Sequence, residues 1–249
     1  MDNLEAIYAR HSVRNYTGVA LDDAEARQLQ QVIDTVSAAS GLNIQLLRNN
    51  PQTFELVARF GAIRGCKDCI AFVAHKRDQD EAIGYWGQLI VLEAQKMGLN
   101  TCWARMFAQR KCQADCPPNA AVRIVIAVGH GVNNGSVRES KSATDVVTIA
   151  SGATKPAWFD TAVEAALLAP TAMNRQAFSI ALERDGEVCI TAPGKGLTTI
   201  DLGIVRRNFD EAKTACANGS SPSNIDRVKR DGSFRVTLGK ETQLGNGGA

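Results

Sequence analysis

The sequence predicts a globular protein in which amphipathic helices are mixed with buried strands. Its 249 residues are 45% hydrophobic and 22% charged, an ordinary composition that excludes disordered, collagen-like and coiled-coil chains. Apolar residues recur at helical spacing in several segments, and other short runs are nearly all apolar, as in buried strands. A chain of this length forms either one large domain or two small ones.

The clearest secondary-structure signals lie in the first part of the chain. Helices are expected where apolar residues recur every three or four positions, at 4–8, 22–37 and 82–97. The last of these is the strongest prediction, because Gly98 stands where a helix C-cap belongs. Extended segments are expected at 43–47, 70–74, 100–103 and 122–128, the last as a central strand because it is almost wholly apolar.

A change in composition divides the chain. The segment 151–156 combines Ser, Gly, Lys and Pro and reads as a linker, so we expect two halves at 1–150 and 151–249. In the second half, helices are expected at 158–168 and 199–217. Two strands at 178–182 and 188–192 are expected to be joined by a turn at Asp185-Gly186.

The two halves show weak sequence similarity to each other. The segment 29–46 resembles 160–177 at a fixed offset, and each follows the pattern of an amphipathic helix that leads into a strand. Residues 86–89 can likewise be aligned with 202–205, which places Gly87 opposite Gly203. Because the similar segments occur in the same order in both halves, the sequence predicts an internal duplication with a shortened second copy.

Charge and hydropathy exclude several classes of partner. A net charge of +2, with no block of like charge, gives no arm for nucleic acid. No run approaches the roughly 20 apolar residues that cross a bilayer, so no membrane partner is expected. Residues 1–14 lack the apolar core of a secretory signal, and the seven cysteines are an odd number. We therefore expect reduced thiols in a cytoplasmic protein.

Four short motifs point to one family. Arg10-His11-Ser12-Val13-Arg14 resembles the Arg-x-Ser-x-Arg opening of the FMN-dependent nitroreductase family. The segment 169–176 resembles the family's Ala-Pro-Ser/Thr-x-x-Asn-x-Gln sequence. Residues 98–103 are similar to its Gly-Leu-x-x-x-Trp helix exit, and 122–129 with the basic residues that follow are similar to its penultimate strand and basic loop. Together in one chain of this length, the four motifs indicate this family.

The resemblance implies an α+β fold with a mixed, mostly antiparallel sheet flanked by helices. In the family, both motifs lie in one chain, and a homodimer brings them onto one flavin from opposite subunits. Here the intact Arg-x-Ser-x-Arg is in half one and the intact Pro-Thr-x-x-Asn is in half two, while Ala39 replaces the proline of the first-half copy. The chain thus resembles the subgroup in which one polypeptide mimics the dimer. This implies a monomer with one composite flavin site.

The resemblance also assigns residues to FMN. Arg10 and Ser12 are expected at the phosphate, because a guanidinium fork meets phosphate oxygens in pairs. Arg14 is expected near the N1–O2 edge of the ring, where a positive charge stabilises the reduced flavin. The full set of cofactor contacts implied is Arg10, His11, Ser12, Arg14, Trp103, Ala104, Arg105, Arg138, Lys141, Pro170, Thr171 and Asn174.

The remaining assignments divide by the part of FMN that they meet. Arg138 or Lys141 would add a cation at the phosphate, and the segment 103–105 would offer a backbone amide to N5. Pro170 and Thr171 would form a wall of the ring site, with Asn174 as a polar contact. The implied reaction passes electrons from NAD(P)H through FMN to small planar acceptors such as nitroaromatics or quinones. It needs no catalytic nucleophile, only Arg14 as an electrostatic tuner.

Two other interpretations stay open at the level of sequence. The shortened second half is compatible with a flavin-binding carrier or sensor that does not turn over. Cys66-x-x-Cys69 with Cys112-x-x-x-Cys116 has a spacing that suggests a zinc, iron–sulfur or thiol redox site. Cys69 directly precedes a predicted buried strand, and no turn glycine flanks the second pair, so we expect no metal and assign these thiols to apolar packing. Trp86 and Trp103 are expected to pack in the core.

Overall fold

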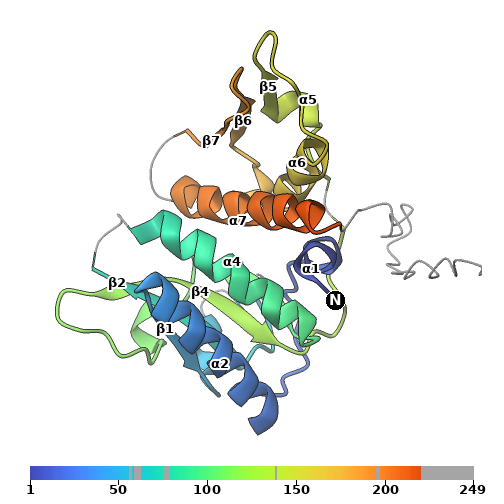
Figure 1. Ribbon diagram of the computed structural model, residues 1–249. Helices are drawn as coiled ribbons and strands as arrows, with labels where there is room; N and C mark the ends of the chain where they lie inside the picture. The colour runs from blue at the N-terminus through green and yellow to red at the C-terminus, as the bar shows by residue number, and fades with distance from the viewer. Residues whose placement is uncertain (56–57, 59–62, 76–78, 138, 194–196, 220–249) are drawn as a thin grey trace, which may run out of the picture.

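The computed structural model describes residues 1–55, 58, 63–75, 79–137, 139–193 and 197–219 (Figure 1). Its helices are α1 (Asn3–Ala9), α2 (Asp23–Ser40), α4 (Asp80–Lys96), α5 (Ala143–Val146), α6 (Phe159–Leu167) and α7 (Leu197–Ala217), with the 3-10 turns η1 (Pro51–Phe54), η3 (Gln109–Lys111) and η4 (Ala172–Asn174). Its strands are β1 (Asn43–Leu47), β2 (Asp68–Ala74), β3 (Asn100–Ala104), β4 (Ala121–Gly129), β5 (Val147–Ile149), β6 (Ser179–Leu182) and β7 (Val188–Thr191). The helices and strands expected within the described residues are confirmed, within a few residues at their ends. A final strand that the sequence predicts at 236–238 lies outside the described residues.

A four-stranded antiparallel sheet organises the first part of the chain, with the strand order β1-β2-β4-β3. Side chains alternate between its faces. Ile70 and Phe72 of β2 join the core under α2 and α4, whereas Cys69 and Ala71 belong to a second apolar cluster on the other face. Figure 1 shows α2 and α4 lying across this sheet. Burial on both faces explains why β2 and β4 read as almost continuous apolar runs in the sequence.

A smaller three-stranded sheet, β5-β6-β7, belongs to the second part. The hairpin β6–β7 is antiparallel, and its turn lies at Asp185-Gly186 as predicted. Strand β5 was not expected: it precedes the predicted boundary at 150/151, yet it pairs in parallel with β6. Residues 147–149 therefore join the second sheet, although they are contributed by the half that precedes the boundary.

The two parts meet along α4 and α7, whose backbones touch. A Cβ atom added to Gly84 would lie 2.0 Å from the Ile200 carbonyl oxygen, and one added to Gly203 would lie 2.0 Å from that of Glu81. Each glycine thus meets the carbonyl group of the residue that lies three positions before the other glycine. One apolar cluster runs through this contact and includes buried residues of both parts. A twofold relation between the halves would produce such a reciprocal contact. The contact pairs Gly203 with Gly84, however, whereas the sequence alignment of the halves pairs Gly203 with Gly87.

A chain of buried polar side chains crosses the same contact. Trp103 Nε1 donates to Gln88 Oε1 at 3.2 Å, Gln88 Nε2 donates to Asn208 Oδ1 at 3.0 Å, and Asn208 Nδ2 donates to the Ala165 carbonyl at 3.0 Å. Gln88 and Asn208 are fully buried. The chain links β3, α4, α7 and α6 in turn. The Trp103 ring also stacks on Phe72 with centroids 5.7 Å apart, which confirms that this indole packs in the core.

Gly203→Ala is expected to lower the free energy of unfolding by about 1–3 kcal/mol, because its methyl group would clash with the Glu81 carbonyl and force α4 and α7 apart. Urea denaturation followed by circular dichroism measures this change. Thr214→Ala, at an exposed position of the same helix, serves as the control for helix propensity. A Gly203→Ala midpoint equal to that of the wild type would show that the backbone contact does not limit the packing.

Candidate functional site

The predicted phosphate-binding segment runs beside β3. Ser12 forms a parallel bridge with Thr101, and the Val13 amide donates to the Thr101 carbonyl at 3.0 Å. Val13 is buried, whereas Arg14 is exposed and its carbonyl accepts from the Arg64 amide at 2.8 Å. The segment is therefore fixed by its backbone, and the side chain of Arg14 points to solvent.

Arg10 joins the two parts of the chain. Its side chain is only 4% exposed, and Nη2 donates to the Leu168 carbonyl at 3.2 Å. Leu168 is the C-cap of α6, where helix carbonyls lack partners inside the helix. A guanidinium there is also favoured by the negative end of the helix dipole. Arg10 thus holds the end of α6 directly before Pro170, which is itself buried.

The loop after β4 continues from this segment to α6. Gly135 has φ +83°, and a Cβ atom there would lie 2.9 Å from His11 Cβ, so the loop passes closely over the motif. Farther along, Ser140 Oγ donates to the Leu167 carbonyl at 3.4 Å. Lys141 binds Gln176 twice, through its amide to Oε1 at 2.7 Å and through Nζ to the carbonyl at 3.0 Å. Arg138, the other predicted cation, lies outside the described residues.

The segment 170–176 has an unusual backbone. Met173, Asn174 and Gln176 have φ values of 54°, 53° and 47°, a left-handed conformation that is uncommon for residues with a side chain. Hydrogen bonds hold it: Thr171 Oγ1 accepts from the Gln176 amide at 3.0 Å, and Asn174 Nδ2 donates to the Glu139 carbonyl at 2.8 Å. Such conformations persist only where the surroundings enforce them, and they concentrate at functional sites.

Two residues outside the predicted cofactor contacts complete this arrangement. Gln176 is 2% exposed, and its Nε2 donates to the Leu167 carbonyl at 2.7 Å. Asp201 of α7 accepts from the Ala172 amide at 2.9 Å, and its partial burial raises the pKa of its carboxyl to about 6, against the opposing effect of that hydrogen bond. Gln176 lies within the family motif, so its place in the motif was a signal. Asp201 offered none, because an acidic residue in a helix is ordinary.

The structure thus connects most of the predicted residues into one region. We call the C-terminal end of α6 with Arg10, the segment 139–141 and the segment 170–176 the α6 junction. His11 and Ser12 adjoin it through Gly135. Ala104 is buried at the end of β3 and Arg105 is exposed just beyond it. No hydrogen bond or ion pair among the described residues joins segment 103–105 or Arg14 directly to segment 170–176.

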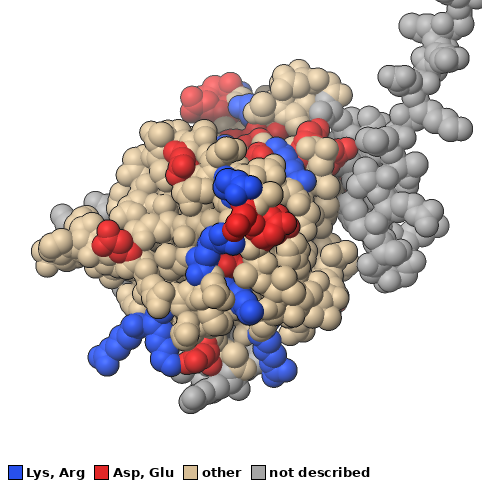
Figure 2. Space-filling model, turned by 90° about the horizontal axis from the view of Figure 1, so that it is seen from below, with Lys and Arg blue, Asp and Glu red and all other residues tan. Residues whose placement is uncertain are grey.

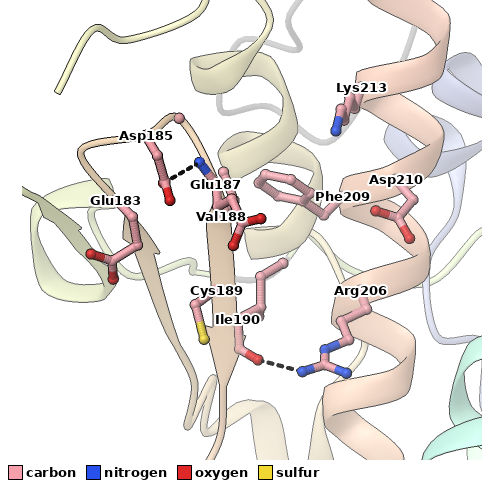
Figure 3. Close-up of a pocket in the computed structure, with 11 residues that line it drawn as sticks. Glu183, Asp185, Glu187, Val188, Cys189, Ile190, Arg206, Phe209, Asp210 and Lys213 are labelled. Carbon is pink, nitrogen blue, oxygen red and sulfur yellow. Dashed lines mark hydrogen bonds between the residues drawn. The ribbon is translucent and has the colours of Figure 1, made fainter.

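A hollow also lies elsewhere on the molecule. An open groove of ≈ 760 Å³ lies between the β6–β7 hairpin and α7 (Figure 3). Glu183, Asp185 and Glu187 line its hairpin side, and Arg206 of α7 donates to the Ile190 carbonyl at 2.8 Å. None of the residues predicted to contact FMN lines it. The cofactor assignments therefore do not coincide with this groove.

Charges of both signs are interspersed on the surface. On the face shown in Figure 2, basic and acidic side chains lie among uncharged residues without a broad patch of one sign. This distribution matches the balanced composition of the chain. Within the described segments, no helix combines the length and the apolar character needed to cross a membrane.

The cysteines do not form the metal site that their spacing suggests. In the part of the chain that the structure describes, no three His, Cys, Asp or Glu side chains gather in a way that would hold a metal ion. No disulfide joins any of the seven cysteines, all of which are described. Cys66 donates to the carbonyls of Asp68 and Val128, at 3.2 and 3.5 Å, and is buried.

A four-stranded antiparallel sheet under α2 and α4, docked through α7 to a smaller second part, defines an α+β protein of the nitroreductase class. The chain belongs to the family described as "Putative TM nitroreductase", whose model matches residues 2–213. A solved structure described as a "putative nitroreductase", from Thermotoga maritima MSB8, covers 88% of this chain with 86% of its own length, at 21% identity and a TM-score of 0.62. This likeness confirms the predicted fold.

Other solved nitroreductases match a smaller share of the chain. One in complex with FMN, from Desulfovibrio desulfuricans, covers 58% of this chain with 94% of its own length, at 23% identity and a TM-score of 0.45. An FMN-dependent nitroreductase from Clostridium difficile R20291 covers 57% with 93% of its own length, at 14% identity and a TM-score of 0.43. Among curated proteins, no match was found.

The raised pKa of Asp201 predicts a pH-dependent stability. Between the unfolded value of 3.8 and the folded value of about 6, the folded protein binds more protons than the unfolded chain, so this carboxyl makes stability fall as pH rises. Asp201→Asn keeps an acceptor for the Ala172 amide but does not titrate. The free energy of unfolding of the variant, relative to the wild type, is expected to increase from about pH 4 to about pH 6 and then to level off. Urea titrations at several pH values measure it, and a constant difference would contradict the assignment.

Proposed function

We propose that this protein is an FMN-dependent oxidoreductase with one flavin site built from both parts of the chain. The observation that carries the proposal is the hydrogen bond from Arg10 to the Leu168 carbonyl. It brings the intact Arg-x-Ser-x-Arg and Pro-Thr-x-x-Asn motifs together in one molecule of a nitroreductase family, although they lie about 160 residues apart in sequence. Two incomplete copies of a dimer's site are thereby combined into one complete set.

Groups at the α6 junction and in the neighbouring segment 12–14 beside β3 suit FMN. Lys141 and Arg14 are exposed cations, and among the described residues neither forms an ion pair with a carboxylate, so their charge is available to an anion such as phosphate. Met173 is 78% exposed and offers apolar surface beside the polar segment, as a planar ring requires. The hydroxyl of Ser12 and the amide of Asn174 add polar groups from opposite parts of the chain.

The residues of the chain bind and orient in this proposal, while the cofactor carries the redox chemistry. FMN, when bound, accepts electrons from NAD(P)H and passes them to small planar acceptors such as nitroaromatics or quinones. Arg14 would supply a fixed positive charge that favours negative charge on the ring. Strand β3 anchors the backbone at 103–105 in the sheet, so that a backbone amide of this segment would be offered to FMN from a rigid position. Because one chain would supply both parts of the dimer's site, we propose a monomer. The odd number of cysteines favours a reducing cytoplasm as its location.

Purified protein, supplied with FMN during refolding or purification, is expected to be yellow and to absorb at roughly 450 nm, as oxidised flavins do. Addition of NADH or NADPH under nitrogen is expected to bleach this band, and a nitroaromatic or quinone is expected to restore it. Flavin that is retained but never bleached would favour a carrier or sensor. Protein that takes up no FMN at all would overturn the proposal.

Variants at the α6 junction test the place of the cofactor. Lys141→Ala removes a charge-assisted contact of about 1.5–3 kcal/mol, so the Kd for FMN is expected to rise by roughly one to two decades. Asn174→Ala is expected to raise it roughly five-fold, because a neutral hydrogen bond contributes about 1 kcal/mol. Fluorescence quenching of free FMN measures both. Lys213→Ala, in the groove beside the β6–β7 hairpin, is the control and is expected to leave the Kd unchanged. The reverse pattern would move the flavin into that groove.

A further inference from the structure

Two cysteines that belong to different spacing motifs meet in space. Cys69 lies on β2 and is completely buried, and Cys112 lies just after η3 and is half-buried. Cys112 packs against the buried apolar cluster that contains Cys69, where the two thiols interact with each other and with Thr53 of η1. The sequence groups Cys69 with Cys66 and Cys112 with Cys116, whereas the fold pairs Cys69 with Cys112. Neither residue belongs to the α6 junction.

Hydrogen bonds hold the backbone around the pair in place. The Ala108 amide donates to the Thr53 carbonyl at 2.8 Å, which ties η1 to the start of η3. The buried side chain of Asn50, with its amide oriented to suit its neighbours, accepts from the Gln113 amide at 3.0 Å and donates to the Lys111 carbonyl at 3.2 Å. Asn50 thus holds the backbone on both sides of Cys112. This support fixes the exposed member of the pair against the buried one.

The two thiols differ in chemistry. The hydrogen bond from Cys69 stabilises the Cys112 thiolate and lowers the pKa of Cys112 to about 7, in spite of its partial burial. The same bond and burial raise the pKa of Cys69. Charged side chains nearby are the Lys111–Glu55 ion pair, which is exposed, and Asp115, which acts on Cys116. The thiolate of such a pair is the nucleophile, and the second thiol is the group that resolves its oxidised form.

We propose that Cys112 and Cys69 form a reversible redox pair, in which Cys112 reacts with a hydroperoxide and Cys69 closes a disulfide. The Cys112 thiolate attacks the terminal peroxide oxygen, the O–O bond breaks, and the departing hydroxide or alkoxide takes a proton to give water or an alcohol. The Cys112 sulfenic acid is then attacked by Cys69 sulfur: the S–S bond forms, the S–O bond breaks, and hydroxide leaves with the Cys69 proton as water. In total, two thiols lose two electrons and two protons to the peroxide. A thiol reductant reverses the change.

Hydrogen peroxide in small molar excess over the full-length protein tests this. Digestion without reductant, followed by mass spectrometry, is expected to give one peptide pair linked through Cys69 and Cys112, which dithiothreitol separates. The rate of link formation is expected to rise with pH through about pH 7 and to level off about one unit higher, where Cys112 is almost fully ionised. A link from Cys112 to Cys116, or oxidation of Cys112 to sulfinic acid with Cys69 intact, would overturn the proposal.

Variants add a second readout. Cys69→Ala is expected to leave Cys112 as a sulfenic acid that a dimedone probe labels, and to abolish the link. Cys116→Ser, four residues beyond Cys112 and exposed, is the matched control and is expected to form the link at an unchanged rate. Circular dichroism verifies that each variant is folded. Should Cys69→Ala not fold, the peptide map of the wild-type protein decides by itself, because it identifies the linked residues directly.

Discussion

The backbone contact between α4 and α7 is the constraint on which the rest of the structure depends. Helices with side chains at their crossing usually stay about 8–10 Å apart. Here Gly84 and Gly203 have no side chain, so the carbonyl group of one helix can approach the glycine Cα of the other. This approach fixes α7, and with it α6, against the first part of the chain. Helix α1 secures the same arrangement, because Asn3 Nδ2 donates to Glu211 Oε2 of α7 at 2.8 Å. The end of α6 thereby lies within reach of Arg10, the residue that follows α1.

Polar groups buried at this contact fix its register. An amide left without partners in such a place costs about 1–3 kcal/mol, so Gln88 and Asn208 favour the one alignment of α4 and α7 in which each satisfies the other. Apolar packing alone tolerates small shifts between helices, whereas a hydrogen-bonded pair does not. A shift of α7 would also displace Asp201 from the Ala172 amide. The position of segment 170–176 is therefore coupled to the core by specific polar contacts as well as by burial.

The sequence predicted the regular elements because each depends on a local pattern of apolar residues. It did not predict β5, since its three residues are partly or fully exposed and form a strand only because the edge of β6 is beside them. The alignment of the two halves matched Gly87 with Gly203. A Cβ atom at Gly87 would lie 2.5 Å from Trp103 Cη2, so Gly87 makes room for that ring, and Gly84 makes the contact with α7 instead. Gln176 lay in a recognised motif, but its role came from long-range contacts. The cysteine spacing did not predict the pair for the same reason: Cys69 and Cys112 are neighbours only in the folded chain.

The two halves end their corresponding helices differently, which supports one flavin site instead of two. In the first half, α2 ends at Gly41, whose φ of 69° is the ordinary left-handed C-cap, and the chain continues directly into β1. In the second half, the corresponding turn after α6 holds three left-handed residues with side chains, and Arg10, Lys141 and Asp201 bind it from outside. A conformation of this kind is retained only where other contacts enforce it. The turn after α6 is thus the specialised one of the two, and the cations that meet it, Arg10 and Lys141, come from the part of the chain before residue 150.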